Sequence, residues 1–362
     1  MAGEAREGHI PPFRWYAETV HSWVITMRLL RILSLLLGLL GSIHALETGA
    51  MGMDIDPFYI RDQGPFSQVF GVPPAEGGKL VPARKLDIRL AFDLANSDSG
   101  AWLPQETLEL DGETHRYTVA LRYGLTDKVE LGLDIPYIDF NGGILDGFMN
   151  DFHKTIGRSL AQKGAGKNRI VFSYARNGVT EIDSRSRTSG FGDLLLSVAL
   201  PLHRGESVSS RSVAVRAALK LPTGDPDTLR GSGGTDFSMR IAANDGATLS
   251  AWRITLYAAG GVLLLGKGEV LKEQQRDFAG FGTVGFGWSP LDWLALKLQL
   301  DMHSAFYRDS DAVVLNSDVY QLAGGFSFAL PRDTTLDFSM SDNIGSETSP
   351  DVTFHVDVRK RF

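Results

Sequence analysis

The sequence predicts an all-β fold: a transmembrane, antiparallel, up-and-down β-barrel of about 12 strands, with both termini in the periplasm. Three observations predict it. Apolar and polar residues alternate in about 12 separate runs, the connections between the runs are alternately short and long, and the chain ends on an aromatic residue. Short turns on one side of the membrane and longer loops on the other are typical of outer-membrane barrels.

The composition excludes several classes of protein. The 362 residues carry 36 Lys and Arg against 43 Asp and Glu, so the chain is not a strongly basic nucleic-acid binder. The absence of cysteine excludes disulfides and thiolate metal sites. The sequence has no nucleotide-binding, zinc-protease or calcium-loop motif, and it predicts no cofactor and no metal site.

The N-terminal region predicts a secretory signal. Residues 27–45 read "MRLLRILSLLLGLLGSIHA". Arg28 and Arg31 near their start are followed by an apolar core that is too short to span a membrane. We expect a signal peptide here, with a short anchor helix as the alternative. Residues 1–26 show no periodicity and are expected to be an upstream extension, with synthesis beginning at Met27.

Residues 46–82 are predicted to be irregular. Pro65, Pro73 and Pro74 exclude a long regular element, because proline lacks the backbone donor that a helix or a central strand needs. Two interpretations remain open for this stretch, a periplasmic lead-in or a plug inside the barrel.

The predicted barrel occupies residues 83–362. The stretch "KLDIRLAFDL" places Leu86, Ile88 and Leu90 on one face and charged residues on the other, as period-two alternation requires. Similar runs lie at 115–124, 129–137, 190–203, 209–222, 235–244, 250–265, 277–289, 292–305, 318–330, 333–342 and 352–362. The expected long connections are 96–112, 141–188, 223–234, 266–276, 306–317 and 343–351.

The last run, "DVTFHVDVRKRF", resembles the sorting signal that the barrel assembly machinery reads. The residues that carry this resemblance are Phe354, Val356, Val358 and Phe362, which are apolar and end on the terminal aromatic. Lys360 departs from the pattern. The implied partners are the assembly machinery during biogenesis, and then outer-membrane lipids and lipopolysaccharide.

The polar faces of the runs carry charge, which we expect to line the lumen. Basic residues on the middle runs are Arg216, Lys220, Arg240 and Arg253; acidic residues on the first, third and last two runs are Asp87, Glu130, Asp134, Asp337 and Asp357. Two interpretations remain open. The charges form a transverse field across a channel, or they form a salt-bridge network that fills a narrow lumen.

The stretches "RDQGPFSQVFGVPPAE", "ELDGETHRYTVALRYGLTDKVELGLDIPY", "GGILDGFMNDFH" and "GFGDLLLSVALPL" resemble the domain-of-unknown-function family 3187. The resemblance implies an outer-membrane barrel without an assigned activity. The stretch "LKLPTGDPDTLRGSGGTDFSM" is also similar to a broader group of outer-membrane proteins of aromatic-degradation pathways, often described as transporters. It implies neither a substrate nor catalytic residues.

Two loop features suggest weaker sites. His153, Asp146 and Asp151 lie close together in the loop "GGILDGFMNDFHKTIGRS", as a lipid hydrolase would need, but the same stretch has the periodicity of a short helix at the barrel mouth. The outer-loop aspartates are solvated, hold a divalent cation or bridge lipopolysaccharide; they are Asp225, Asp227, Asp309 and Asp311.

Three functions are therefore compared. The first is a narrow passive channel or transporter for small polar or amphipathic solutes. The second is a closed barrel with a structural or assembly role in the envelope. The third, less favoured, is a lipid-surface hydrolase that uses the 146–159 loop.

Overall fold

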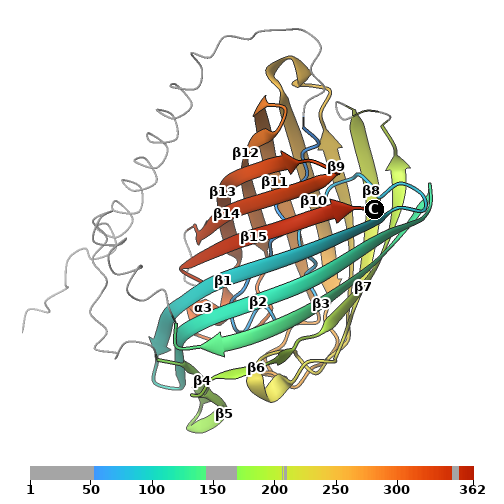
Figure 1. The fold of residues 1–362 in the computed structure, drawn as a ribbon. Helices are drawn as coiled ribbons and strands as arrows, with labels where there is room; N and C mark the ends of the chain where they lie inside the picture. The colour runs from blue at the N-terminus through green and yellow to red at the C-terminus, as the bar shows by residue number, and fades with distance from the viewer. Residues whose placement is uncertain (1–52, 144–168, 206, 208–209, 345–349) are drawn as a thin grey trace, which may run out of the picture. The chain divides into compact units, whose positions relative to one another are not determined.

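The computed structural model describes residues 53–143, 169–205, 207, 210–344 and 350–362. Twelve antiparallel strands close into a barrel, as the sequence predicts, because the first strand pairs with the last (Figure 1). No helix among the described residues is long and apolar enough to cross a membrane. The signal peptide and the extension predicted at residues 1–45 lie outside the described residues.

The wall strands follow each other around the barrel in chain order. They are β1 (Leu86–Trp102), β2 (Glu106–Thr126), β3 (Val129–Asn141), β7 (Leu194–His203), β8 (Arg211–Leu221), β9 (Asp236–Asp245), β10 (Ile254–Leu264), β11 (Phe278–Leu291), β12 (Leu294–His303), β13 (Val319–Leu330), β14 (Thr334–Asn343) and β15 (Val352–Arg361). We call the end that holds the β2–β3 and β11–β12 turns the short-turn end, and the opposite end the long-loop end. Leu86 and Phe362 exchange two backbone hydrogen bonds at the short-turn end, which closes the wall there.

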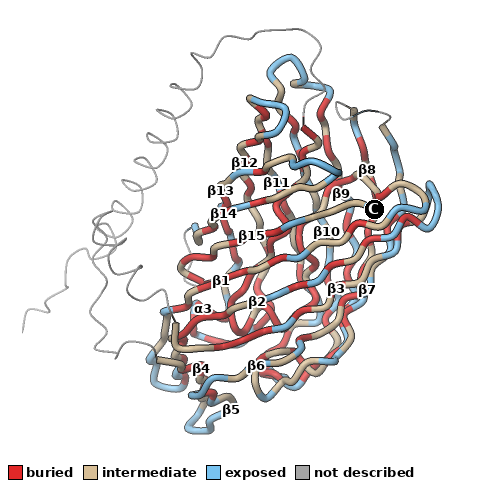
Figure 2. The backbone as a smooth tube through the Cα atoms, in the orientation of Figure 1, coloured by how far each residue is buried: buried red, intermediate tan, exposed pale blue. Residues whose placement is uncertain are grey.

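The alternation of the sequence becomes the two faces of the wall. Large apolar side chains such as Leu90, Val119 and Ile241 are exposed, while their polar neighbours along each strand are buried. Figure 2 shows buried segments alternating with exposed and intermediate ones along the wall strands. An apolar outer band over a polar interior is the arrangement that a lipid bilayer requires of a barrel.

One predicted connection is wrong. Residues 96–112 were expected to form a long loop, but β1 and β2 continue as a paired ribbon to Trp102 and Thr107 and leave a turn of residues 103–105. Backbone pairing extends this ribbon beyond the regular apolar alternation on which the prediction depended.

The predicted 141–188 connection contains further strands. β4 (Val171–Arg176) pairs with β2, and β5 (Val179–Ser184) pairs with β4; β6 (Thr188–Phe191) pairs with β3 just before β7. Short helical turns lie in other connections: η1 (Pro226–Thr228), η2 (Ser250–Trp252) and α3 (Val313–Asn316).

Residues 53–82, here called the lumenal segment, run inside the barrel without forming a helix or a strand (Figure 1). The first limb runs along β12 in the same direction, because successive contacts join residues that are always 241 positions apart in the sequence. Lys297 Nζ donates to Asp56 O, and Gln299 Oε1 accepts from Phe58 N. His303 contacts Asp62. Because β12 runs from the short-turn end to the long-loop end, this limb does the same.

The second limb of the lumenal segment returns along β9. Gly71 N donates to Asp236 Oδ2 at 2.8 Å, and Gly78 N donates to Asn244 Oδ1 at 2.7 Å, near the opposite ends of β9. The two limbs are joined by the hydrogen bond from Ala75 N to Ile60 O. The lumenal segment is therefore a hairpin whose tip points to the long-loop end.

The tip of the hairpin packs into the main hydrophobic cluster of the molecule. Phe66, Val69 and Phe70 are buried against side chains from the strand ends and loops at the long-loop end, among them Phe306 and Tyr307. The ring centroids of Phe70 and Phe306 lie 4.9 Å apart. This cluster lies at the long-loop end of the lumen.

Candidate functional site: the polar lumen

The structure buries eight of the nine charged residues that the sequence assigns to the lumen; they are Arg216, Lys220, Arg240, Asp87, Glu130, Asp134, Asp337 and Asp357. Each has an oppositely charged partner within 3.2 Å. Arg216 on β8 and Glu130 on β3 contact each other at 2.7 Å, so the basic and acidic sides meet directly. The geometry is that of an internal salt-bridge network.

Arg253 does not line the lumen. It follows η2 in the turn between β9 and β10, in the left-handed conformation with φ of 57°, and its side chain pairs with Asp292 in the β11–β12 turn. The sequence prediction began this run at residue 250, four residues before the strand. The strand begins at Ile254.

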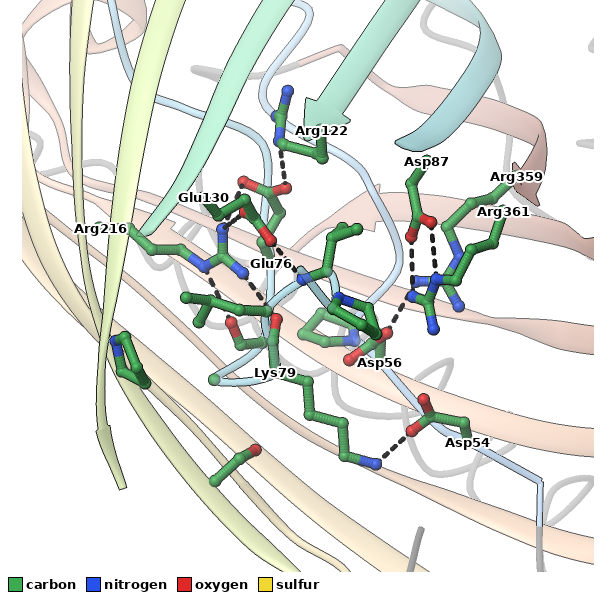
Figure 3. A pocket seen from close by; sticks show the side chains of 18 of the residues that line it. Asp54, Asp56, Glu76, Lys79, Asp87, Arg122, Glu130, Arg216, Arg359 and Arg361 are labelled. Carbon is green, nitrogen blue, oxygen red and sulfur yellow. Dashed lines mark hydrogen bonds and ion pairs between the residues drawn. The ribbon is translucent and has the colours of Figure 1, made fainter. Parts of the chain in front are cut away.

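The lumenal segment supplies the partner that the sequence prediction lacked. Glu76 Oε1 lies 2.7 Å from Arg122 Nε, and its Oε2 lies 2.9 Å from Arg240 Nη2 and 3.8 Å from Arg216 Nη1. Figure 3 shows the Glu76 carboxylate between Arg122 and Arg216. One carboxylate thus lies within 3.8 Å of arginines from β2, β8 and β9.

Arg216, Arg240 and Lys220 also hold the lumenal segment through its backbone. Arg216 Nε donates to Gly77 O and its Nη2 to Lys79 O, at 2.9 and 2.8 Å. Arg240 Nη1 donates to Pro74 O at 2.6 Å, and Lys220 Nζ donates to Val69 O at 2.8 Å. Proline has no backbone N–H, but its carbonyl still accepts, so the Pro73-Pro74 stretch suits a basic wall.

On β15, His355 lies between two carboxylates. Its Nδ1 is 2.7 Å from Asp93 and its Nε2 is 2.9 Å from Asp357, which also accepts from Arg89 at 2.9 Å. The sequence analysis did not select His355 or Arg89 as lumenal sites. Both stand at inward positions of alternating runs, so the period-two pattern contained the signal.

Free space remains in the lumen at the short-turn end. A cavity of about 490 Å³ opens there between the lumenal segment and the wall (Figure 3). Charged side chains on its lining include Asp54, Asp56, Lys79, Asp87, Arg359 and Arg361. Three cavities farther along the segment hold about 20, 10 and 30 Å³, room for little more than a water each.

At the long-loop end, the hairpin tip is also tied by polar contacts. Tyr307 in the loop after β12 donates its hydroxyl to Phe66 O at 2.9 Å. Burial raises the pKa of the Tyr307 phenol well above its ordinary value, and the Asp236 carboxylate adds to the rise. The phenol therefore stays a neutral donor at physiological pH.

The remaining predicted residues divide by location. Val358 and Phe362 are exposed on the outer face of the last strand, where Val356 and Phe354 are half-buried; their reading as a sorting signal stays a prediction. His153, Asp146 and Asp151 lie outside the described residues. Among the residues that are described, no group of three or more His, Cys, Asp or Glu side chains is placed to hold a metal ion.

The fold is similar to solved outer-membrane barrels. The COG4313 outer membrane channel from Pseudomonas putida F1 aligns with a TM-score of 0.52 at 13% identity, over 79% of this chain and 98% of that chain. The NanC porin gives 0.41 at 9%, over 75% and 98%, and the Ralstonia pickettii toluene transporter TbuX gives 0.37 at 10%, over 87% and 96%. No curated protein sequence matches the chain.

A closed barrel with an apolar outer band and a charged interior defines this molecule as a β-barrel of the outer-membrane type. Residues 34–362 match the family model described as "Protein of unknown function (DUF3187)", and the chain belongs to that family. The family resemblance seen in the sequence is thereby confirmed.

Proposed function

We propose that this chain is a bacterial outer-membrane channel that passes small polar or amphipathic solutes when the lumenal segment leaves its place in the barrel. The observation that carries the proposal is that the wall of the barrel is complete without the lumenal segment. The twelve wall strands close on themselves without the segment, which contributes no strand to the sheet. Withdrawal of the segment would therefore leave the cylindrical β-sheet intact and the polar lumen open to solutes.

The proposal includes an orientation. Outer-membrane barrels have short turns on the periplasmic side and longer loops outside. The short-turn end, with the 490 Å³ cavity and both ends of the described chain, accordingly faces the periplasm in our proposal. A solute entering from outside would first meet the apolar cluster around the hairpin tip.

A second function, a permanently closed barrel with a structural role, is favoured by the small cavities of 10 to 30 Å³ along the segment. The two functions differ in whether the hairpin moves. A reversible cross-link between the hairpin and the wall tests this, and it is practical because the chain has no cysteine of its own.

Gly71 and Asp236 are the positions for the cross-link. A Cβ built on Gly71 lies 3.0 Å from the Asp236 Cβ, so a shift of a few tenths of an ångström gives the spacing of about 3.5–4.5 Å that a disulfide takes. The double variant Gly71→Cys with Asp236→Cys is compared, oxidised and reduced, with each single variant in planar bilayers. Oxidation should abolish the conductance of the double variant alone, and reduction should restore it.

Two results would oppose the proposal. Equal conductance of the oxidised and reduced double variant would mean that solutes do not need the hairpin to move. Wild-type and reduced proteins that insert into bilayers and never conduct would establish the closed barrel instead.

A further inference from the structure

We propose that the arginines around Glu76 form a binding site for the carboxylate of a small organic anion, which Glu76 occupies while the lumenal segment is in place. This inference rests on the proposed channel function and adds a class of solute to it. Glu76 would act as a tethered stand-in for the solute, and the solute would compete with the hairpin for the same site.

The wall geometry requires an anion at this position. Arg216 and Arg240 stand directly opposite each other on β8 and β9, both buried. Like charges directly opposite on neighbouring strands repel, and a buried charge is tolerated only when it is paired. Arg122 approaches the same carboxylate from β2, and the side chains of all three arginines are at most 9% exposed.

Arg240 depends on the lumenal segment more than the other two arginines do. Without the segment, Arg216 keeps Glu130 and Arg122 keeps Asp134, since both carboxylates belong to wall strands. The partners that the structure gives Arg240 are Pro73 O, Pro74 O and Glu76, which all belong to the segment. Withdrawal of the hairpin would leave Arg240 without all three of these hydrogen-bond partners.

A second observation shows that Glu76 leaves part of Arg240 unused. In the described part of the chain, Arg240 Nε is buried and has no hydrogen-bond partner. Glu76 uses only the Nη2 edge, because its carboxylate is also held by Arg122 and its backbone follows Pro73 and Pro74. A free carboxylate is not tethered and can bind a guanidinium side-on through two parallel hydrogen bonds.

The charge of the segment agrees with an anionic solute. Residues 53–82 contain four acidic and two basic side chains, a net charge of −2. Their withdrawal makes the lumen more positive by the same amount. A narrow polar pore with an added positive field concentrates anions and disfavours cations.

Chemical rescue tests the inference. Glu76→Ala removes the CH2–COO− group of the side chain, which is about the size of acetate, and leaves the three arginines in place. Loss of this carboxylate should unseat the hairpin and raise the open probability in planar bilayers. Added sodium acetate should then reduce the current in a saturable way, while acetamide, its neutral analogue, should not.

The matched variants are made in the Glu76→Ala background. Arg240→Gln should weaken acetate binding, so that the acetate concentration that blocks half of the current rises about tenfold or more, as loss of a charge-assisted pair predicts. Arg116→Gln removes a buried cation from β2 outside the group around Glu76 and should leave the acetate effect unchanged. If Glu76→Ala does not assemble, Glu76→Gln is used, and the reversal potential in a KCl gradient should shift toward chloride.

The outcomes separate the two proposals. Variants at Glu76 that insert and never conduct would remove the channel function, and this inference with it. Variants that conduct but respond equally to acetate and acetamide, or keep the acetate effect after Arg240→Gln, would overturn the carboxylate site and leave the channel.

Discussion

Lys297 and Asp337 illustrate how single residues hold charge inside this barrel. Their Nζ and Oδ2 atoms lie 2.8 Å apart, and both side chains are at most 7% exposed. Such a pair gains little over an apolar pair of the same size, but removal of one partner leaves a buried charge and is strongly destabilising. The same Nζ atom also donates to Asp56 O of the lumenal segment, so this buried pair helps to hold the first limb against β12.

A residue-scale prediction concerns the hairpin tip. Tyr307→Phe removes the hydroxyl that donates to Phe66 O and leaves a buried carbonyl without this donor. We expect the free energy of unfolding to fall by about 1–2 kcal/mol. The measurement is the temperature at which the folded band is lost in a heated-sample gel. Tyr320→Phe, at a side chain 43% exposed on β13, is the control and should change nothing.

No loss of stability in Tyr307→Phe, or an equal loss in both variants, would contradict the role assigned to this hydrogen bond. A higher open probability of Tyr307→Phe in bilayers would add support for hairpin movement.

Single residues could be placed from the sequence where they stand on a regular strand. Arg216, Lys220 and Arg240 were placed correctly because a strand turns alternate side chains to one face. Lys297 stands at an inward position between Leu296 and Leu298, so the same pattern would have identified it. Glu76 could not be found in this way, because an irregular segment has no period to assign its side chains to a face.

At the scale of elements, β15 and the lumenal segment illustrate two kinds of sequence information. The alternation of β15 predicted its outer and inner faces, and its pairing with β1 runs from Asp87–Arg361 to Asn96–Val352. For the segment, the prolines predicted irregularity but left the lead-in and plug interpretations open. Contacts with strands 46 to 241 residues away decide its position, and no local pattern encodes them.

An element-scale prediction concerns the end of β15. Phe362 exchanges backbone hydrogen bonds with Leu86, and its side chain is 56% exposed on the outside. Its ring therefore contributes little packing inside the barrel. If the ring is part of the sorting signal, deletion of Phe362 should lower the amount of protein in the outer membrane, measured by fractionation and immunoblot.

Phe362→Tyr keeps an aromatic ring and the backbone pairing, so it should retain the wild-type level. Phe362→Ala keeps the pairing alone and should behave like the deletion. A wild-type level for Phe362→Ala would show that the ring is not recognised.

For the whole molecule, closure of the barrel is the property that distinguishes this fold from an open sheet. Each of the twelve wall strands has a partner on both sides, and the β1–β15 pairing completes the circle. A closed wall has no edge strand at which unfolding begins, because each wall strand is hydrogen-bonded to two neighbours. Such a barrel should resist detergent until it is heated.

The whole-molecule prediction follows from this closure. The purified protein should give a β-rich circular-dichroism spectrum and migrate differently on a gel when unheated and when boiled. Val356→Pro is the test of closure, because Val356 pairs with Phe92 on β1 and Phe338 on β14, and proline cannot donate to either neighbour. This variant should lose the gel shift, whereas Val356→Ile should keep it. A mainly helical spectrum of the wild type, or a gel shift that survives Val356→Pro, would mean that the β1–β15 seam does not close the barrel.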